Sequence, residues 1–199
     1  MGPDAPFCNN PPMIELILGG ARSGKSALAE QRAAESGLAV TYIATAQAGD
    51  EEMAHRIAHH RSRRPARWLT VEEPQHLAAA LQTHAAPDRC LLVDCLTLWL
   101  SNLLLGPGLE PERGALLDCL PGLPGHVILV SNEVGWGIVP INELARRFAD
   151  EQGRLNQAVA AVSDCVTLVA AGLPLELKGG ARAGPCRATG QNDSGLPPR

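Results

Sequence analysis

Eight consecutive residues near the start of the chain fit the pattern G-x-x-x-x-G-K-[ST] of a phosphate-binding loop without a gap. In such a loop, glycines let successive backbone N–H groups surround phosphate oxygens, the lysine reaches the β- and γ-phosphates, and the last hydroxyl can hold Mg²⁺. The motif therefore predicts a site for a nucleoside triphosphate. Its residues are Gly19, Gly20, Ala21, Arg22, Ser23, Gly24, Lys25 and Ser26.

The residues on either side of the motif predict the strand and the helix that a phosphate loop joins. Residues 13–18 form a short apolar run, MIELIL, which is typical of a buried strand. Residues 26–36 are rich in Ala, Leu, Glu and Gln, which favour helix, and Gly37 stands where helices commonly end. This context favours nucleotide binding over the alternative, a glycine-rich turn without a function.

Apolar runs and helical patterns alternate along the rest of the chain. The alternation predicts an α/β fold in a single domain, with a mostly parallel sheet covered by helices on both faces. Strands are predicted at 39–44, 68–71, 89–94, 127–131 and 164–172. Helices are predicted at 50–64, 74–84, 96–105, 116–120 and 141–163, with a loop at 106–114. The composition of the termini predicts a disordered leader at 1–12 and a disordered tail at 179–199 around a domain at 13–178.

The bulk composition argues against several classes of protein. The net charge of −4 argues against nucleic acid as a partner, and no apolar run approaches the roughly 20 residues of a membrane helix. The six cysteines include no C-x-x-C pair, so we expect no zinc site and instead buried thiols in a reducing compartment. We therefore expect a cytoplasmic protein with neither nucleic acid nor membrane as a partner.

An acidic residue ends the apolar run at 89–94. An apolar strand with a carboxylate at its tip is the Walker-B pattern, which we expect next to the phosphate-loop strand, with Asp94 and Ser26 holding Mg²⁺. A helix N-cap is a second role for Asp94 and is compatible with the first. The glycine-rich turn at 132–137, which carries an Asn and a Glu after a predicted strand, is a further candidate for a site.

The predicted helix at 50–64 is unusually basic for an acidic chain. On a helix with about 100° per residue, His60 shares a core-facing stripe with Met53 and Ile57, whereas His59 lies on the opposite, polar side. We therefore interpret His60 as a packed residue and His59 as the histidine presented to a ligand. A solvated charged face and a clamp for a polyphosphate are both compatible with the basic residues, which are His55, Arg56, His59, His60, Arg61, Arg63 and Arg64.

Several of these segments together resemble one family, the bifunctional adenosylcobinamide kinase / adenosylcobinamide-phosphate guanylyltransferases of cobalamin biosynthesis. The resemblance extends from about residue 13 to residue 178 and implies a RecA-like P-loop NTPase fold and a homo-oligomer, a trimer. Asp94 stands where many relatives carry Glu, and the carboxylate is kept. The matching segments are the phosphate loop, 42–46, 50–53, 56–61, 64–68, 94–97 and 132–140.

The resemblance also implies the chemistry. In the first reaction, ATP or GTP, bound with Mg²⁺ and Lys25, phosphorylates adenosylcobinamide. In the second, His59 takes GMP from GTP and forms a covalent intermediate. The intermediate passes GMP to adenosylcobinamide phosphate, which gives adenosylcobinamide-GDP. Two alternatives stay open: a P-loop kinase of another small metabolite with the His/Arg helix as a lid, and a nonenzymatic nucleotide switch. The nucleotide-binding residues implied outside the loop are Ala44, Thr45, Ala46, Arg61, Ser62, Arg63, Arg64, Glu72 and Asp94.

Overall fold

A computed structural model describes residues 11–47, 65–106 and 108–179. The predicted helix at 50–64 lies outside the described residues, as does nearly all of the predicted leader and tail. The elements are β1 (Met13–Gly19), α1 (Lys25–Glu35), β2 (Ala39–Ala44), β3 (Leu69–Glu72), α3 (Leu77–His84), β4 (Arg89–Asp94), α4 (Leu96–Leu104), α5 (Leu109–Cys119), η1 (Leu120–Gly122), β5 (His126–Asn132), α6 (Glu143–Val162), β6 (Cys165–Ala170) and β7 (Leu173–Lys178).

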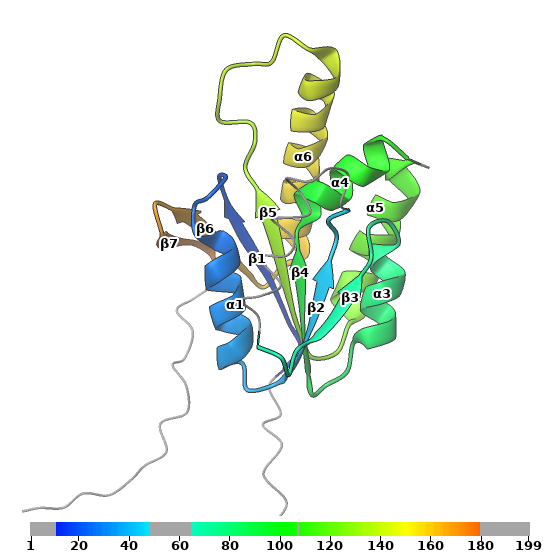
Figure 1. Ribbon diagram of the computed structural model, residues 1–199, viewed down its shortest axis with the longest axis vertical. Coiled ribbons are helices and arrows are strands. Elements are labelled where there is room, and N and C mark those ends of the chain that lie inside the picture. Colours follow the sequence, from blue (N-terminus) through cyan, green and yellow to red (C-terminus); the bar gives the residue numbers. More distant parts are fainter. Residues whose placement is uncertain (1–10, 48–64, 107, 180–199) are drawn as a thin grey trace, which may run out of the picture.

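The strands form one seven-stranded sheet in the order β3-β2-β4-β5-β1-β6-β7 (Figure 1). All neighbouring strands are parallel except β6 and β7, which are antiparallel. The predicted α/β class with a mostly parallel sheet is confirmed. The prediction that the acidic strand adjoins the phosphate-loop strand is wrong, because β5 lies between β1 and β4. Sequence pattern identifies buried strands, but the path of the crossover connections decides which of them become neighbours.

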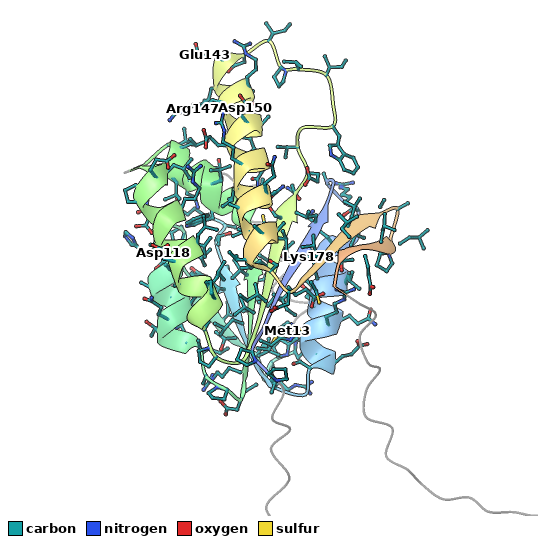
Figure 2. All side chains as sticks on the ribbon, turned by 180° about the vertical axis from the view of Figure 1, so that it is seen from behind. Met13, Asp118, Glu143, Arg147, Asp150 and Lys178 are labelled. Atoms are coloured by element: carbon teal, nitrogen blue, oxygen red, sulfur yellow. The ribbon has the colours of Figure 1, made fainter. Side chains whose placement is uncertain are left out.

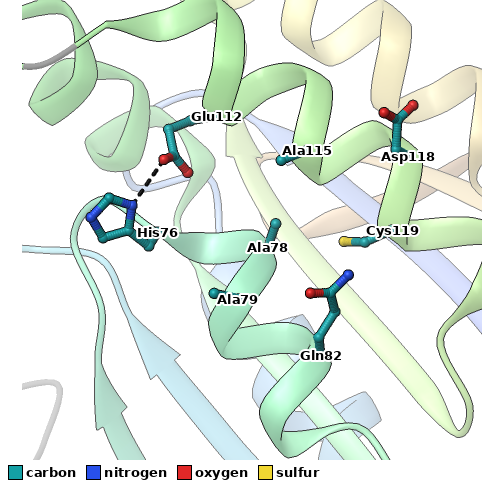
Figure 3. Close-up of a pocket in the computed structure, with 8 residues that line it drawn as sticks. All are labelled: His76, Ala78, Ala79, Gln82, Glu112, Ala115, Asp118 and Cys119. Carbon is teal, nitrogen blue, oxygen red and sulfur yellow. Dashed lines mark hydrogen bonds and ion pairs between the residues drawn. The ribbon is translucent and has the colours of Figure 1, made fainter.

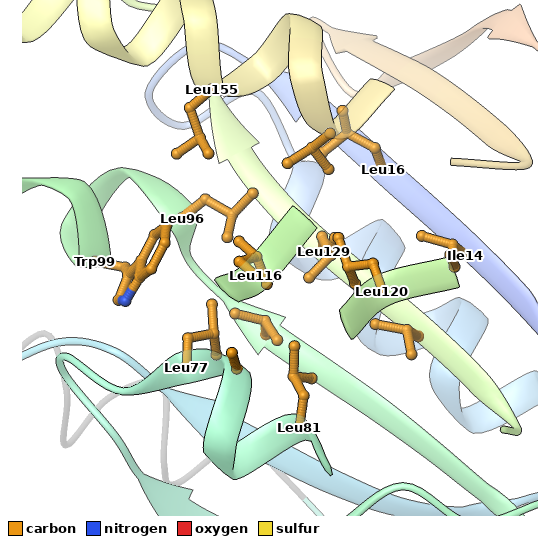
Figure 4. Close-up of a cluster of buried hydrophobic side chains, with 14 of the residues drawn as sticks. Ile14, Leu16, Leu77, Leu81, Leu96, Trp99, Leu116, Leu120, Leu129 and Leu155 are labelled. Carbon is orange, nitrogen blue, oxygen red and sulfur yellow. The ribbon is translucent and has the colours of Figure 1, made fainter. Parts of the chain in front are cut away.

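Helices cover both faces of the sheet, as predicted, but unequally. Consecutive strand residues point to opposite faces, so Leu16 and Ile17 belong to two different apolar layers. The larger layer joins the sheet to α3, α4, α5 and α6 (Figure 4), and the smaller one joins it to α1. Trp99 is fully buried in the larger layer, where its indole N–H donates to the carbonyl of Gln75 at 2.7 Å.

Two parts of the fold differ from the prediction. The loop predicted at 106–114 is mostly α5, because Pro111 stands in the first helical turn, where no intrahelical partner needs its missing N–H. The predicted final strand at 164–172 is confirmed as β6, but the chain then turns back and forms a further strand, β7, which was not predicted. Ala171 and Gly172 have φ angles of 53° and 79°, and this left-handed pair forms the two-residue turn between the strands.

A buried ion pair joins the phosphate-loop strand to α1. Glu15 is fully buried, pairs with Arg32, and lies 3.5 Å from Nε2 of His126. Removing one partner of a buried pair leaves a charge without full compensation. We expect Arg32→Met to lower the free energy of unfolding by about 3 kcal/mol, measured by urea denaturation. The exposed control Arg154→Met should change it by less than about 0.5 kcal/mol, and equal unfolding midpoints for both variants would contradict a stabilising role of the pair.

Candidate active site

The phosphate loop has the predicted strand–loop–helix form. β1 ends at Gly19 and α1 begins at Lys25, so the loop turns within the residues between them. Gly24 has a φ of 99°, a left-handed conformation that a side chain would strain. The buried ammonium of Lys25 donates to the carbonyl of Gly20 at 3.1 Å, which holds the lysine across the loop.

The β6–β7 hairpin supports this loop from the side. The backbone N–H of Gly172, in the hairpin turn, donates to the carbonyl of Ser23 at 2.9 Å. A Cβ atom on Gly24 would lie 3.3 Å from Cα of Gly172, so the two glycines allow a close backbone approach. Ser23 Oγ is buried and has no hydrogen-bond partner within the described residues. Sequence reasoning missed the hairpin, although leucines alternate along 173–177 as in a strand.

The ends of three parallel strands bring predicted site residues together. Glu72 at the end of β3 pairs in register with Ala44 of β2, and Ala44 pairs on its other side with Asp94 of β4. Thr45 and Ala46 follow Ala44 directly. Because parallel strands end at the same edge of the sheet, these residues share that edge with the phosphate loop, where α/β proteins bind ligands.

Tyr42 holds the carboxylate of Asp94. Its phenol O–H donates to Oδ2 of Asp94 at 3.0 Å, and the tyrosine is buried beneath it. Tyr42 stands two residues before the position that pairs with Asp94, so both side chains point to the same face of the sheet. Sequence reasoning missed this contact, because it depends on β2 and β4 being neighbours.

Thr45 ties the end of β2 to the start of α4. Its hydroxyl donates to the carbonyl of Cys95 at 2.7 Å and accepts from the Cys95 N–H at 2.9 Å. The side-chain amide of Asn102 donates to the carbonyls of Thr45 at 2.8 Å and Pro74 at 3.0 Å. These bonds fix the backbone beside Asp94, and Asn102 is a positioning residue that sequence reasoning did not identify.

Cys95, next to Asp94, is an inert thiol. Burial raises its pKa to about 11, and the charge of Asp94 adds to the shift. At pH 8 roughly one Cys95 side chain in a thousand is then the reactive thiolate. We expect iodoacetamide at pH 8 to leave Cys95 unmodified in the folded protein while it labels the partly exposed Cys165, as measured by peptide mass spectrometry. Equal labelling rates at the two cysteines would contradict this assignment.

The segment after β5 exposes apolar side chains at the same edge of the sheet. Trp136, Ile138 and Ile141 are 72%, 96% and 98% exposed. Figure 1 shows that this segment and the first part of α6 extend beyond the sheet. In the view from behind, Glu143 lies at the projecting end of α6 (Figure 2). Near the other end of α6, Lys178 of β7 donates to two carbonyls of the last turn at 2.9 Å.

A cleft of about 430 Å³ lies between α3 and α5, away from the predicted site residues (Figure 3). At one end His76 Nδ1 and Glu112 Oε1 are 2.8 Å apart, and this hydrogen bond raises the pKa of His76. Asp118 and Cys119 line the other end. Since no predicted site residue lines the cleft, it adds nothing to the nucleotide site.

The basic part of the predicted site lies outside the described residues, namely His59, Arg61, Ser62, Arg63 and Arg64. Their contribution to the nucleotide site therefore stays a prediction. Within the described residues, no cluster of three or more His, Cys, Asp or Glu side chains could hold a metal alone. None of the described helices could span a membrane.

Comparison with known proteins decides the family. The model of the family "Cobinamide kinase / cobinamide phosphate guanyltransferase" matches residues 15–177. The chain belongs to this family. With its phosphate loop, it is a nucleotide-dependent transferase of cobalamin biosynthesis, and the family predicted from the sequence is confirmed.

Two bacterial relatives match over nearly their whole length. The bifunctional adenosylcobalamin biosynthesis protein CobP of Pseudomonas aeruginosa is 65% identical, over 84% of this chain and 98% of the relative. CobU of Salmonella typhimurium, with the same description, is 42% identical over 83% of this chain and 100% of the relative.

Solved structures resemble the chain more distantly. The flagellar accessory protein FlaH of Methanocaldococcus jannaschii has a TM-score of 0.49 and 13% identity, over 84% of this chain and 78% of that one. The RadB recombinase has a TM-score of 0.43 and 16% identity, over 79% of this chain and 74% of that one.

Proposed function

We propose that this family member catalyses two successive reactions with one phosphate loop and one histidine. The first makes adenosylcobinamide phosphate and the second makes adenosylcobinamide-GDP. The observation that carries the proposal is the formed loop at Gly19–Ser26, whose Lys25 lies at the same sheet edge as Asp94 and the ends of β2 and β3. A triphosphate bound there meets an ammonium, the first N–H groups of α1 and a carboxylate that can hold a metal.

In the first reaction, the aminopropanol hydroxyl of adenosylcobinamide attacks the γ-phosphorus of ATP or GTP. The new O–P bond forms as the bond to the β,γ-bridging oxygen breaks, and the nucleoside diphosphate leaves. Catalysis of this step is mainly positioning and charge neutralisation. Lys25 supplies a positive charge, and the loop backbone supplies N–H donors to the phosphate oxygens.

Ser26 and Asp94 fit a magnesium site. Both offer hard oxygen ligands, one from the first turn of α1 and one from the end of β4. Mg²⁺ usually takes only one or two protein ligands and completes its shell with water and phosphate, which suits two residues without a larger cluster. Tyr42 orients the Asp94 carboxylate by its hydrogen bond. When bound, the metal would neutralise charge on the phosphates.

In the second reaction, His59 attacks the α-phosphorus of GTP and pyrophosphate leaves. The resulting GMP-histidine then passes GMP to adenosylcobinamide phosphate, which restores the histidine. A neutral imidazole nitrogen is a nucleophile near pH 7, which suits it to this role. Further contacts to the nucleotides come from Ala44, Thr45, Ala46, Arg61, Ser62, Arg63, Arg64 and Glu72.

We also propose the domain boundaries, the oligomeric state and the location of the protein. Residues 13–178 form one catalytic domain, and copies of the chain assemble into a trimer in the cytoplasm. The sheet, which contains every described strand, supports the single domain.

Product analysis tests the proposed function. We expect the purified protein with Mg²⁺, ATP and adenosylcobinamide to yield adenosylcobinamide phosphate, and added GTP to convert this product to adenosylcobinamide-GDP, as measured by liquid chromatography and mass spectrometry. If phosphorylation occurs and GTP yields no GDP derivative, the protein is a kinase alone, as in the alternative in which the predicted His/Arg helix is a lid. If neither product forms, the proposed function is wrong.

A further inference from the structure

Glu133 follows β5 directly and lies against the first residue of the phosphate loop. Asn132 pairs in register with Gly19, and the backbone N–H of Glu133 donates to the carbonyl of Gly19 at 3.2 Å. Because β5 lies between β1 and β4, its end stands between the phosphate loop and Asp94. The backbone of Glu133 is therefore fixed at the centre of the candidate active site.

A buried network of hydrogen bonds holds the Glu133 side chain. The amide of Asn156, which is 4% exposed, donates to Glu133 Oε1 at 3.1 Å and to the carbonyl of Asn132 at 3.0 Å. Asn156 Oδ1 accepts from Ser131 Oγ at 2.7 Å and from Gln152 Nε2 at 2.9 Å. Gln152 also donates to Ser131 Oγ at 2.9 Å. Three side chains from β5 and α6 thus support one carboxylate, with Asn156 in direct contact with it.

The network occupies a contact between helix and sheet that is otherwise apolar. On the same helix, Leu155 and Val159 are fully buried in the apolar core. Polar groups in such a contact are costly unless their hydrogen bonds are made, and a connected network holds its members rigidly. A carboxylate held in this way beside a phosphate loop has the support that a reacting group needs.

We propose that Glu133 is the general base of the kinase step, an inference that rests on the proposed function. Its carboxylate accepts the proton of the aminopropanol hydroxyl as that oxygen attacks the γ-phosphorus. The bond to the bridging oxygen breaks, the nucleoside diphosphate leaves with the electron pair, and the carboxylic acid returns its proton to water. A carboxylate fills this role in other phosphoryl transfers to hydroxyl groups.

The two carboxylates at this edge then have separate tasks. Asp94 accepts a hydrogen bond from Tyr42 at the end of β4 and is assigned to the metal. Glu133 directly follows the neighbouring strand, β5, beside the loop that binds the phosphates, and is assigned to the hydroxyl of the acceptor. Since the guanylyl transfer to His59 removes no hydroxyl proton, the base serves one reaction only.

Glu133→Gln tests this assignment, because the amide keeps the size of the side chain and an acceptor for Asn156. We expect kcat for phosphorylation of adenosylcobinamide to fall about 100-fold or more, with KM for ATP within a few-fold of wild type. Glu133→Asp, which keeps a carboxylate, should retain part of the activity. The control is Glu143→Gln, an exposed acid at the start of α6, which should leave kcat unchanged.

Labelling of the enzyme by [α-³²P]GTP reports an intact nucleotide site and should be unchanged in Glu133→Gln. A kcat of Glu133→Gln within threefold of wild type would overturn the assignment. A fall of kinase turnover together with loss of GTP labelling would also overturn it, because losing both activities indicates a structural role for Glu133. If the wild-type protein itself phosphorylates no adenosylcobinamide, the proposed function fails and this inference falls with it.

Discussion

Replacing Lys25 by alanine is expected to lower kcat/KM for the phosphorylation of adenosylcobinamide by about 10²–10³-fold. Lys25 is buried at the start of α1, and its ammonium already lies across the loop, bonded to the carbonyl of Gly20. A preorganised group aimed at the phosphates typically contributes about 3–4 kcal/mol to the transition state, which corresponds to this loss. Steady-state kinetics with ATP as the variable substrate measures it.

The chain provides its own control, because Lys178 is the only other lysine. Lys178 lies on β7, where it bonds to the end of α6. We expect Lys178→Ala to phosphorylate adenosylcobinamide within about twofold of the wild-type rate, since surface changes are usually small. A Lys25→Ala enzyme with the wild-type rate would show that the phosphate loop takes no part in the phosphoryl transfer.

The second large effect is expected from His59→Ala, which should separate the two reactions. Guanylyl transfer from GTP should fall below detection, because the residue that carries GMP is gone. Phosphorylation of adenosylcobinamide should stay within a few-fold of wild type, since Lys25 and the loop are intact. Assays of each product with purified intermediates measure the two rates independently.

The matched control for this variant is His60→Ala. Helical geometry predicts that His60 packs toward the core, so its loss should affect stability more than guanylyl transfer. If guanylyl transfer is instead lost in His60→Ala and retained in His59→Ala, His60 is the nucleophile and His59 is not.

The phosphate loop could be predicted from the sequence because its determinants are local. One apolar run, one motif and one helix-forming segment are contiguous, and the structure has the expected strand, loop and helix between Met13 and Glu35. The end of β4 was likewise identified by its apolar run and terminal Asp94. Each of these signals lies within a few residues along the chain.

The neighbours of these elements could not be predicted in the same way. The position of β5 between β1 and β4 is set by packing across the whole sheet, and no local pattern encodes it. The contacts of Asp94 with Tyr42 and of Glu133 with Asn156 follow from that strand order and from the docking of α6. The local elements could therefore be predicted from the sequence better than the contacts between them.

Secondary structure was predicted wrongly or incompletely at two places that contain proline or glycine. Pro111 and the glycines around it indicated a loop, but proline is compatible with the first turn of a helix, and α5 forms there. Gly172 indicated the end of a strand, and β6 does end at this turn, but the sequence did not indicate that the turn leads directly into a further strand, β7. In both cases the local sequence is compatible with two backbone structures, and tertiary packing determines which of them forms.

Whether His59 carries GMP can be measured as the mass of the intact protein after incubation with GTP and Mg²⁺. We expect the wild-type protein to gain the mass of one GMP, peptide mapping to place it on His59, and His59→Ala to gain nothing. A wild-type protein that gains no mass, or that carries GMP on another residue such as His55 or His60, would show that His59 is not the nucleophile of a two-reaction enzyme.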